Sequence, residues 1–180
     1  MERAGEFRGR RIPPQTPPVK AQAPKTAEVV MQIGLTKAEP QHLEAILPLV
    51  AAFHKEEGVD QATETREAAV QTLLNNPAFG EIWMIESGDE LAGYVAFAFG
   101  YSIEFSGRDA FIDEIYIAPD HRGAGLRTAA LSRLKNALRE SGIKAAHLEV
   151  EVNNAKAQTL YARQGFQMRR NYHLMSARLD

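Results

Sequence analysis

The feature that constrains this chain most is a junction at residues 115–127, IYIAPDHRGAGLR, where an apolar run passes through a glycine-bearing turn into an amphipathic helical pattern. Glycine lets the backbone turn sharply and lets a ligand approach the main chain closely. The first N–H groups of the following helix have no intrahelical partner and lie at the positive end of the helix dipole. The junction therefore predicts a strand–turn–helix unit with an anion site, best suited to phosphate or pyrophosphate.

Two familiar phosphate-binding motifs do not fit this turn. It lacks the three glycines of the dinucleotide fingerprint, and it lacks the Gly-Lys-Ser/Thr of a Walker loop. Taken alone, the junction is equally compatible with a glycine-assisted turn that carries solvated arginines. Its interpretation therefore depends on the rest of the chain.

Hydrophobic periodicity predicts further elements on both sides of the junction. Pro48 is expected to kink or divide the first helix, and Gly88-Asp89 is typical of a hairpin turn. The order strand–helix–helix, three strands, helix, strand, helix, strand indicates an α/β or α+β domain with a mixed sheet. The predicted strands are 29–35, 82–85, 91–97, 110–117, 147–152 and one or two within 166–179, and the predicted helices are 41–57, 63–76, 125–140 and 154–164.

The N-terminal segment differs in composition from the rest. Residues 1–27 hold six basic and two acidic residues, together with five of the nine prolines. Such a stretch can neither pair a ladder nor bury a face, which predicts a disordered or polyproline-like arm at 1–28 and a single domain at 29–180. The arm is either a partner-docking tail or a dispensable extension, and composition favours the extension.

Composition excludes several classes of protein. The absence of cysteine rules out a disulfide scaffold, a cysteine nucleophile, an iron–sulfur cluster and thiolate zinc sites. The five histidines show no metal-ligand spacing, so we expect no metal and interpret them as surface or core polar residues. A formal net charge of −2 argues against a nucleic-acid partner, and no apolar run is long enough for a membrane helix. The expected location is the cytoplasm.

Two motifs resemble the signatures of one enzyme superfamily. Arg122-Gly123-Ala124-Gly125 resembles the acyl-CoA pyrophosphate loop of the GNAT superfamily of N-acetyltransferases, Arg/Gln-x-x-Gly-x-Gly/Ala. The segment from Asn154 to Phe166, NAKAQTLYARQGF, is similar to its second signature, Asn-x-x-Ala-x-x-Leu-Tyr-x-x-x-Gly-Phe. The resemblance covers residues 29–180. It implies a mixed, mostly antiparallel sheet of six to seven strands flanked by about four helices, acetyl-CoA as co-substrate and a possible homodimer.

The resemblance also implies which residues bind acetyl-CoA. The family's strand splays from its neighbour, which would free N–H groups near Ile115 and Ile117, and Asn154 would contact the pantetheine arm. Where the family has Gly or Ala, this chain has Arg127, whose guanidinium either crowds the pyrophosphate or, as we favour, pairs with it. The implied cofactor-binding set is Ile115, Tyr116, Ile117, Arg122, Gly123, Ala124, Gly125, Leu126, Arg127 and Asn154.

Acetyl transfer needs an acid for the leaving thiolate. A thiol has a reference pKa of about 8.5, so proton donation assists its departure. By resemblance, Tyr161 is that general acid. The alternative is a half-buried aromatic residue whose hydroxyl is bonded to the backbone.

The acceptor amine, with a reference pKa of about 10.4, must also lose a proton before it attacks. Strand alternation places the neighbours Asp113 and Glu114 on opposite faces, Asp113 with Ile115 and Glu114 with Ile112. The strand IDEIYI resembles the Leu-Glu-Asp-Leu-Tyr-Val strand of small-amine acetyltransferases, which implies that Asp113 is the base and Glu114 the reserve. An acid that only lines a polar cavity is nearly as compatible.

The acceptor is predicted from weaker features. Gly93-Tyr94, Tyr101-Ser102 and Gly107-Arg108 resemble the diamine acetyltransferase branch, but Phe53-His54 stands where that branch has Tyr-Glu. Glu56 and Glu57 lie within a turn of it. We expect transfer to a primary amine of a small molecule, polyamine or amino-acid-like, in a ternary complex. The alternatives are a protein N-terminus or lysine, an aminoglycoside, or a regulatory domain that binds acyl-CoA without turnover.

Overall fold

The computed structural model describes residues 33–179, and five strands in that range form one sheet in the order β1-β2-β3-β4-β5. Neighbouring strands run antiparallel except β4 and β5, which run parallel. The predicted mixed, mostly antiparallel sheet is confirmed, with one strand fewer than the smallest number expected. The strands are β1 (Ile33–Lys37), β2 (Gly80–Ser87), β3 (Glu90–Ser102), β4 (Gly107–Ile117) and β5 (Ala145–Leu148).

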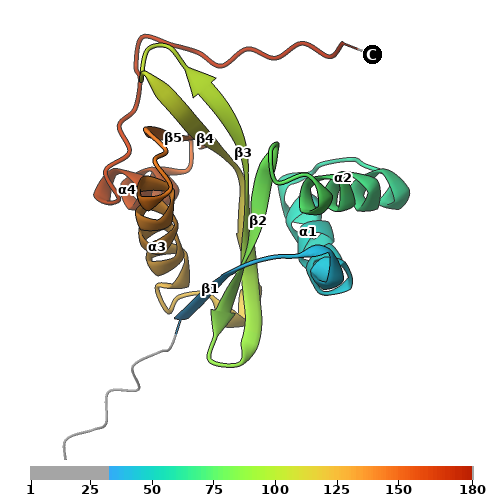
Figure 1. Ribbon diagram of the computed structural model, residues 1–180. Helices are drawn as coiled ribbons and strands as arrows, with labels where there is room; N and C mark the ends of the chain where they lie inside the picture. The colour runs from blue at the N-terminus through green and yellow to red at the C-terminus, as the bar shows by residue number, and fades with distance from the viewer. Residues whose placement is uncertain (1–32, 180) are drawn as a thin grey trace, which may run out of the picture. The chain divides into compact units, whose positions relative to one another are not determined.

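Helices cover both faces of the sheet. Figure 1 shows α1 and α2 on one face and α3 and α4 on the other. The α-helices are α1 (Leu43–Glu57), α2 (Thr63–Asn75), α3 (Leu126–Glu140) and α4 (Ala155–Arg163), and short 3-10 turns, η1 (Pro40–His42) and η2 (Pro119–His121), precede α1 and α3. None of the helices in the described range is long and apolar enough to cross a membrane.

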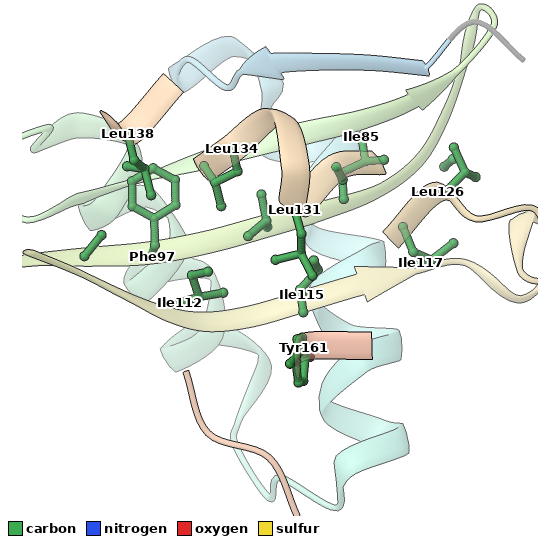
Figure 2. Close-up of a cluster of buried hydrophobic side chains, with 14 of the residues drawn as sticks. Ile85, Phe97, Ile112, Ile115, Ile117, Leu126, Leu131, Leu134, Leu138 and Tyr161 are labelled. Carbon is green, nitrogen blue, oxygen red and sulfur yellow. The ribbon is translucent and has the colours of Figure 1, made fainter. Parts of the chain in front are cut away.

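Each face of the sheet has its own apolar cluster. On the α3 side, Leu131 and Leu134 are fully buried against Phe97 of β3 and Ile112 of β4 (Figure 2). On the α1 side, Ile46 packs with residues of β2, β3 and β4. Burying one such side chain contributes about 1.5 to 3 kcal/mol, so the two clusters fix the helices on the sheet.

The predicted ends of α1 are close to those observed. Gly58 closes the helix in the left-handed region, at φ 69°, where a side chain would be strained. Pro48 lies inside α1 and does not divide it. The reason is packing: Ile46 and Val50 on either side of the proline are buried, which offsets the hydrogen bond that proline cannot donate.

The central register contains a β-bulge. Ala96 of β3 pairs with Glu114, but the next residue, Phe97, pairs with Ile112. Asp113 is therefore an extra residue with no partner on β3, and such an insertion bends the strand and increases its twist. The prediction that Glu114 shares a face with Ile112 is wrong, because the bulge interrupts the alternation on which it rested.

The bulge also accounts for the short last strand. β5 pairs with β4 only from Asp109 to Ile112, immediately before the bulge. The predicted strand at 147–152 is wrong in extent, since β5 is Ala145–Leu148. Because β4 bends after Ile112, the residues that follow Leu148 do not pair with it and do not extend β5.

The predicted closing strands at 166–179 are absent from the described structure. Met168, Tyr172, Leu174 and Met175 in this segment are exposed. A strand needs a partner for its backbone groups, and β5 pairs over only four residues. The predicted arm at 1–28 lies outside the described residues, and so does the beginning of the strand predicted at 29–35.

We predict that Leu134→Ala lowers the free energy of unfolding by about 2 to 5 kcal/mol, because it leaves a cavity under α3. Urea denaturation measures the loss. Leu174→Ala, which truncates a side chain that is 67% exposed, is the matched control and should change stability by less than about 0.5 kcal/mol. Equal losses in the two variants would contradict the described core.

Candidate active site

The candidate site lies where β4 and β5 separate. Past Ile112, β4 continues for five residues to Ile117 without a partner on the β5 side in the described structure. Ile115 and Ile117 are both buried there, beside the helix start of α3. The structure therefore contains the divergence between the two strands that the sequence resemblance implied; which N–H groups it frees for a ligand stays a prediction.

The loop before α3 presents a run of free backbone donors. Within the described residues, none of the main-chain N–H groups from Gly123 to Thr128 donates a hydrogen bond, and the first to do so is Ala129, to the Gly125 carbonyl. Gly123 and Gly125 adopt φ values of 84° and 79°, which a residue with a Cβ would reach only under strain. Main-chain donors concentrated at a helix N-terminus are suited to the pyrophosphate of an acyl-CoA.

Arg122 is already engaged by protein groups. Its Nε donates to the Ile117 carbonyl at 2.8 Å, and one terminal nitrogen contacts both carboxylate oxygens of Glu56 at 2.8 Å. Its guanidinium also lies over the Tyr116 ring, 5.4 Å from the centroid. Arg122 thus holds the loop to the end of β4 and to α1.

Tyr161 of α4 belongs to the apolar cluster on the α3 side and is 8% exposed. Figure 2 shows it beside β4, close to Ile115. Burial raises the pKa of its hydroxyl above the usual value, the Glu57 charge raises it further, and the Arg127 guanidinium lowers it. The group is therefore a protonated phenol at neutral pH, which is the form a general acid requires.

The alternative interpretation of Tyr161, a hydroxyl hydrogen-bonded to the backbone, is not observed. Its hydroxyl forms no hydrogen bond with any of the residues that the structure describes, either backbone or side chain. The Arg127 guanidinium lowers the pKa of this hydroxyl. The residue that departs from the loop motif therefore acts on the predicted acid. Whether Arg127 also pairs with a pyrophosphate stays a prediction.

Asn154 begins α4. Its side-chain oxygen accepts a hydrogen bond from the Ala157 N–H at 3.0 Å, the usual geometry of a helix N-cap. Gly165 ends this segment at φ 86°. The second signature therefore has a structural role in placing Tyr161, whatever Asn154 contacts in a ligand.

The two adjacent acids have different surroundings. Glu114 accepts a hydrogen bond from the Tyr94 hydroxyl at 2.6 Å on one carboxylate oxygen and contacts His54 Nε2 at 2.7 Å on the other. Asp113, at the bulge, is open to solvent on one side, and no described residue donates to its carboxylate through a side-chain hydrogen bond. Of the two, Asp113 is the carboxylate accessible to a substrate.

Both acids influence the same groups. Partial burial raises the pKa of Asp113, the adjacent Glu114 charge raises it further, and His54 lowers it. Burial raises the pKa of Tyr94 far above its usual value, and both carboxylates add to this effect. The charges of both carboxylates therefore act on Tyr94, and the Glu114 charge acts on Asp113.

The sequence does not indicate the contacts of three residues that the structure places around these acids, His54, Arg66 and Tyr94. Arg66, from α2, donates from Nε to His54 Nδ1 at 3.2 Å. His54 was expected to be a surface or core polar residue, and no contact was predicted for Tyr94. No spacing rule links residues 54, 66, 94 and 114, because they meet only when α1, α2, β3 and β4 pack together.

Comparison with known proteins identifies the family. A run of free backbone donors at a helix N-terminus, a buried tyrosine on α4 and a carboxylate at a strand bulge are groups that acyl transfer from acyl-CoA would need. Residues 44–166 match the model of the acetyltransferase (GNAT) family. The chain belongs to this family and is an acetyl-CoA-dependent N-acetyltransferase.

Two curated relatives differ in their named acceptor. A Bacillus subtilis protein assigned as a ribosomal protein bS18-alanine N-acetyltransferase is 33% identical over 112 residues, 61% of this chain and 70% of its own length. The thialysine N-epsilon-acetyltransferase of Mus musculus is 32% identical over 85 residues, 47% of each chain. The two identities are nearly equal, so the resemblance to the diamine branch is not confirmed.

A solved structure agrees with the fold. An integron cassette protein from the mobile metagenome of Cole Harbour Salt Marsh has a TM-score of 0.71 at 28% identity, covering 81% of this chain and 90% of that chain.

In the part of the chain that the structure describes, no cluster of three His, Asp or Glu side chains is suited to a metal ion.

We predict that Tyr94→Phe lowers the free energy of unfolding by about 1.5 to 3 kcal/mol, because it removes a buried hydrogen bond to a charged carboxylate. Tyr116→Phe is the matched control, since the Tyr116 hydroxyl lies 3.5 Å from Glu56 and its loss should cost less than about 0.5 kcal/mol. Urea unfolding of the two variants distinguishes them. The hydrogen-bond assignment fails if Tyr94→Phe is as stable as the control.

Proposed function

We propose that the enzyme transfers the acetyl group of acetyl-CoA to the primary amine of a small polyamine-like or amino-acid-like molecule, by direct attack in a ternary complex. The observation that carries the proposal is the accessible, partly desolvated Asp113 carboxylate at the β4 bulge, beside a fixed second acid. Two negative charges at one point favour a cationic acceptor. We also propose a cytoplasmic location, from the composition of the chain, and a homodimer, from the family resemblance; light scattering would test the homodimer.

The donor would be held mainly by backbone groups. The free N–H groups from Gly123 to Thr128 would bind the pyrophosphate, and the unpaired edge of β4 near Ile115 and Ile117 would contact the pantetheine arm and the thioester carbonyl. Acetyl-CoA supplies the activated acetyl group and a thiolate leaving group. The role of the protein is to hold that group next to the amine.

Two side chains would move protons. Asp113 would accept a proton from the incoming ammonium, directly or through water, as the amine nitrogen forms its bond to the acetyl carbon. Tyr161 would donate its phenolic proton to the sulfur as the carbon–sulfur bond breaks. The raised pKa of each group favours its task, because Asp113 becomes a stronger base and Tyr161 stays protonated.

The second candidate function is acetylation of a protein N-terminus. It is favoured by the Bacillus subtilis relative, whose named acceptor is an alanine of a ribosomal protein. The small-molecule acceptor is supported by the thialysine relative and by the acidic residues Glu56 and Glu57 at the end of α1, near Arg122 and Tyr161 respectively.

An acceptor panel tests these alternatives. Release of CoA thiol would be followed with polyamines, thialysine, lysine, aminoglycosides and a peptide that begins with alanine. We expect turnover with the small diamines and thialysine and little with the peptide. Preference for the peptide would establish the second candidate, and CoA binding without thiol release from any acceptor would indicate a regulatory acyl-CoA-binding domain.

We predict that CoA binds more tightly than pantetheine, because only CoA presents a pyrophosphate to the loop at Gly123–Thr128. Isothermal titration calorimetry with CoA, dephospho-CoA and pantetheine measures the difference. Dephospho-CoA should keep most of the gain, since it retains the pyrophosphate. Equal affinity for all three ligands would show that the loop is not the anion site.

We predict that Tyr161→Phe reduces kcat by about 10² to 10⁴-fold, the usual effect of removing a general acid. Affinity for acetyl-CoA and the melting temperature should change little, because the ring and its packing remain and the hydroxyl has no protein partner to lose. Steady-state kinetics and thermal unfolding test this. Near-normal kcat across the pH range would assign proton donation to water instead.

A further inference from the structure

A partly buried chain of polar side chains lies on the α1 side of the sheet. Arg66 of α2 contacts His54 of α1 at 3.2 Å, His54 contacts Glu114 of β4 at 2.7 Å, and Tyr94 of β3 donates to the same carboxylate at 2.6 Å. His54 is 7% exposed, the only buried polar or charged residue in the described range. Four elements thus converge on one carboxylate next to the bulge.

The contacts determine the tautomer of His54. An arginine Nε–H can only donate, so Nδ1 of His54, which receives it, must be the unprotonated acceptor nitrogen. The ring proton is therefore on Nε2, where it is donated to Glu114 Oε1. Arg66 is itself held in place, because its terminal nitrogen donates to the Gln61 carbonyl at 2.9 Å.

We infer that His54, with its tautomer fixed by Arg66, is a positioning residue that holds Glu114 as an oriented carboxylate beside Asp113. This inference rests on the proposed function, in which Asp113 accepts the proton of the acceptor amine. Both oxygens of Glu114 already accept a hydrogen bond, so Glu114 acts through its charge and Asp113 remains the group that contacts the amine. The division of roles between two adjacent acids follows from these contacts.

The groups that face the acid pair come from every neighbouring element. They are His54 from α1, Arg66 from α2, Tyr94 from β3 and Tyr116 from β4, which lies in the same cluster. Among them, only His54 and Tyr94 donate a side-chain hydrogen bond to Glu114 in the described structure. These two donors fix the position of the Glu114 carboxylate, and the Glu114 charge raises the pKa of Asp113, which favours proton uptake there.

The pH dependence gives the inference a readout that packing alone would not change. Asp113 can accept a proton from the acceptor amine only when its own carboxylate is ionised. His54 lowers the pKa of Asp113, so its removal leaves that pKa higher. In His54→Phe, the acid limb of the kcat profile should therefore move to higher pH, and kcat should fall by up to about 10²-fold as the carboxylate loses its orientation.

A conservative variant separates positioning from packing. His54→Gln retains an N–H donor for Glu114 and a carbonyl oxygen for Arg66, so it should restore most of kcat and return the acid limb toward its original pH. The KM for acetyl-CoA should be unchanged in both variants, because the described hydrogen bonds of His54 go to Glu114 and Arg66 and not to the loop at Gly123–Thr128. Loss of stability in His54→Phe without any change in kcat or in the acid limb would overturn the inference.

The matched control is His147→Phe. His147 of β5 also pairs with an acid, Asp109, at 3.5 Å, but on a part of β4 before the bulge. Its replacement should leave kcat and the pH profile as they are. An equal shift in this control would show that loss of any histidine–carboxylate pair alters the profile.

Nitrogen NMR of the His54 ring tests the inference without turnover. We expect chemical shifts of a neutral ring protonated at Nε2, with the Nδ1–H form absent, and loss of that preference in Arg66→Met. A ring protonated at Nδ1 overturns the inference even if the enzyme is active. If the wild type acetylates none of the amines, the proposed function fails, and the NMR result still decides the tautomer and its contact with Glu114.

Discussion

The one-residue bulge in β4 is the constraint on which the rest of the site depends. The insertion of Asp113 shifts the pairing with β3 between Ala96 and Phe97, and the parallel ladder to β5 ends at Ile112, immediately before it. A strand that bends at this point stops pairing with its neighbour and leaves an unpaired edge. The same residue that interrupts the ladder is the accessible carboxylate, so the geometry that opens the sheet also places the proposed base.

Two helices complete the arrangement on the α3 side of the sheet. The apolar face of α3 is buried against β3 and β4, which holds its N-terminus and the loop of free N–H groups at the end of β4. The Asn154 cap starts α4 so that Tyr161 is buried in the same cluster. Core packing on this side of the sheet therefore holds the helices that carry the proposed anion site and the proposed acid.

Much of this could be predicted from the sequence, because its signals are local. The glycines at 123 and 125, the asparagine at 154 and the helical spacing of α3 each act over a few residues, so the sequence alone indicates them. The bulge was not predicted, since alternation around Asp113 looks regular until the register with β3 is known. The closing strands predicted at 166–179 are absent from the described structure, because a strand also needs a partner edge, which the sequence alone does not supply.

The sequence also does not predict the polar chain from Arg66 to Glu114, because its contacts join residues that are distant in the chain. Its members lie on four elements and share no spacing, and His54 on an apolar helix face is equally typical of a satisfied core histidine. Only the packing of α1 and α2 against the sheet brings the imidazole and the guanidinium together. The structure adds contacts between distant residues to a sequence that already indicates most of the helices and strands.

The most direct test of this account is amide hydrogen exchange with and without acetyl-CoA. The account predicts slower exchange in two segments, β4 from Asp113 to Ile117 and the loop from Gly123 to Thr128, because a bound acetyl-CoA would satisfy donors that have no partner in the described protein. The ladder between β1 and β2 should exchange as before. Protection confined to other elements, or none at saturating acetyl-CoA, would contradict the claim that the divergence of β4 from β5 forms the donor site.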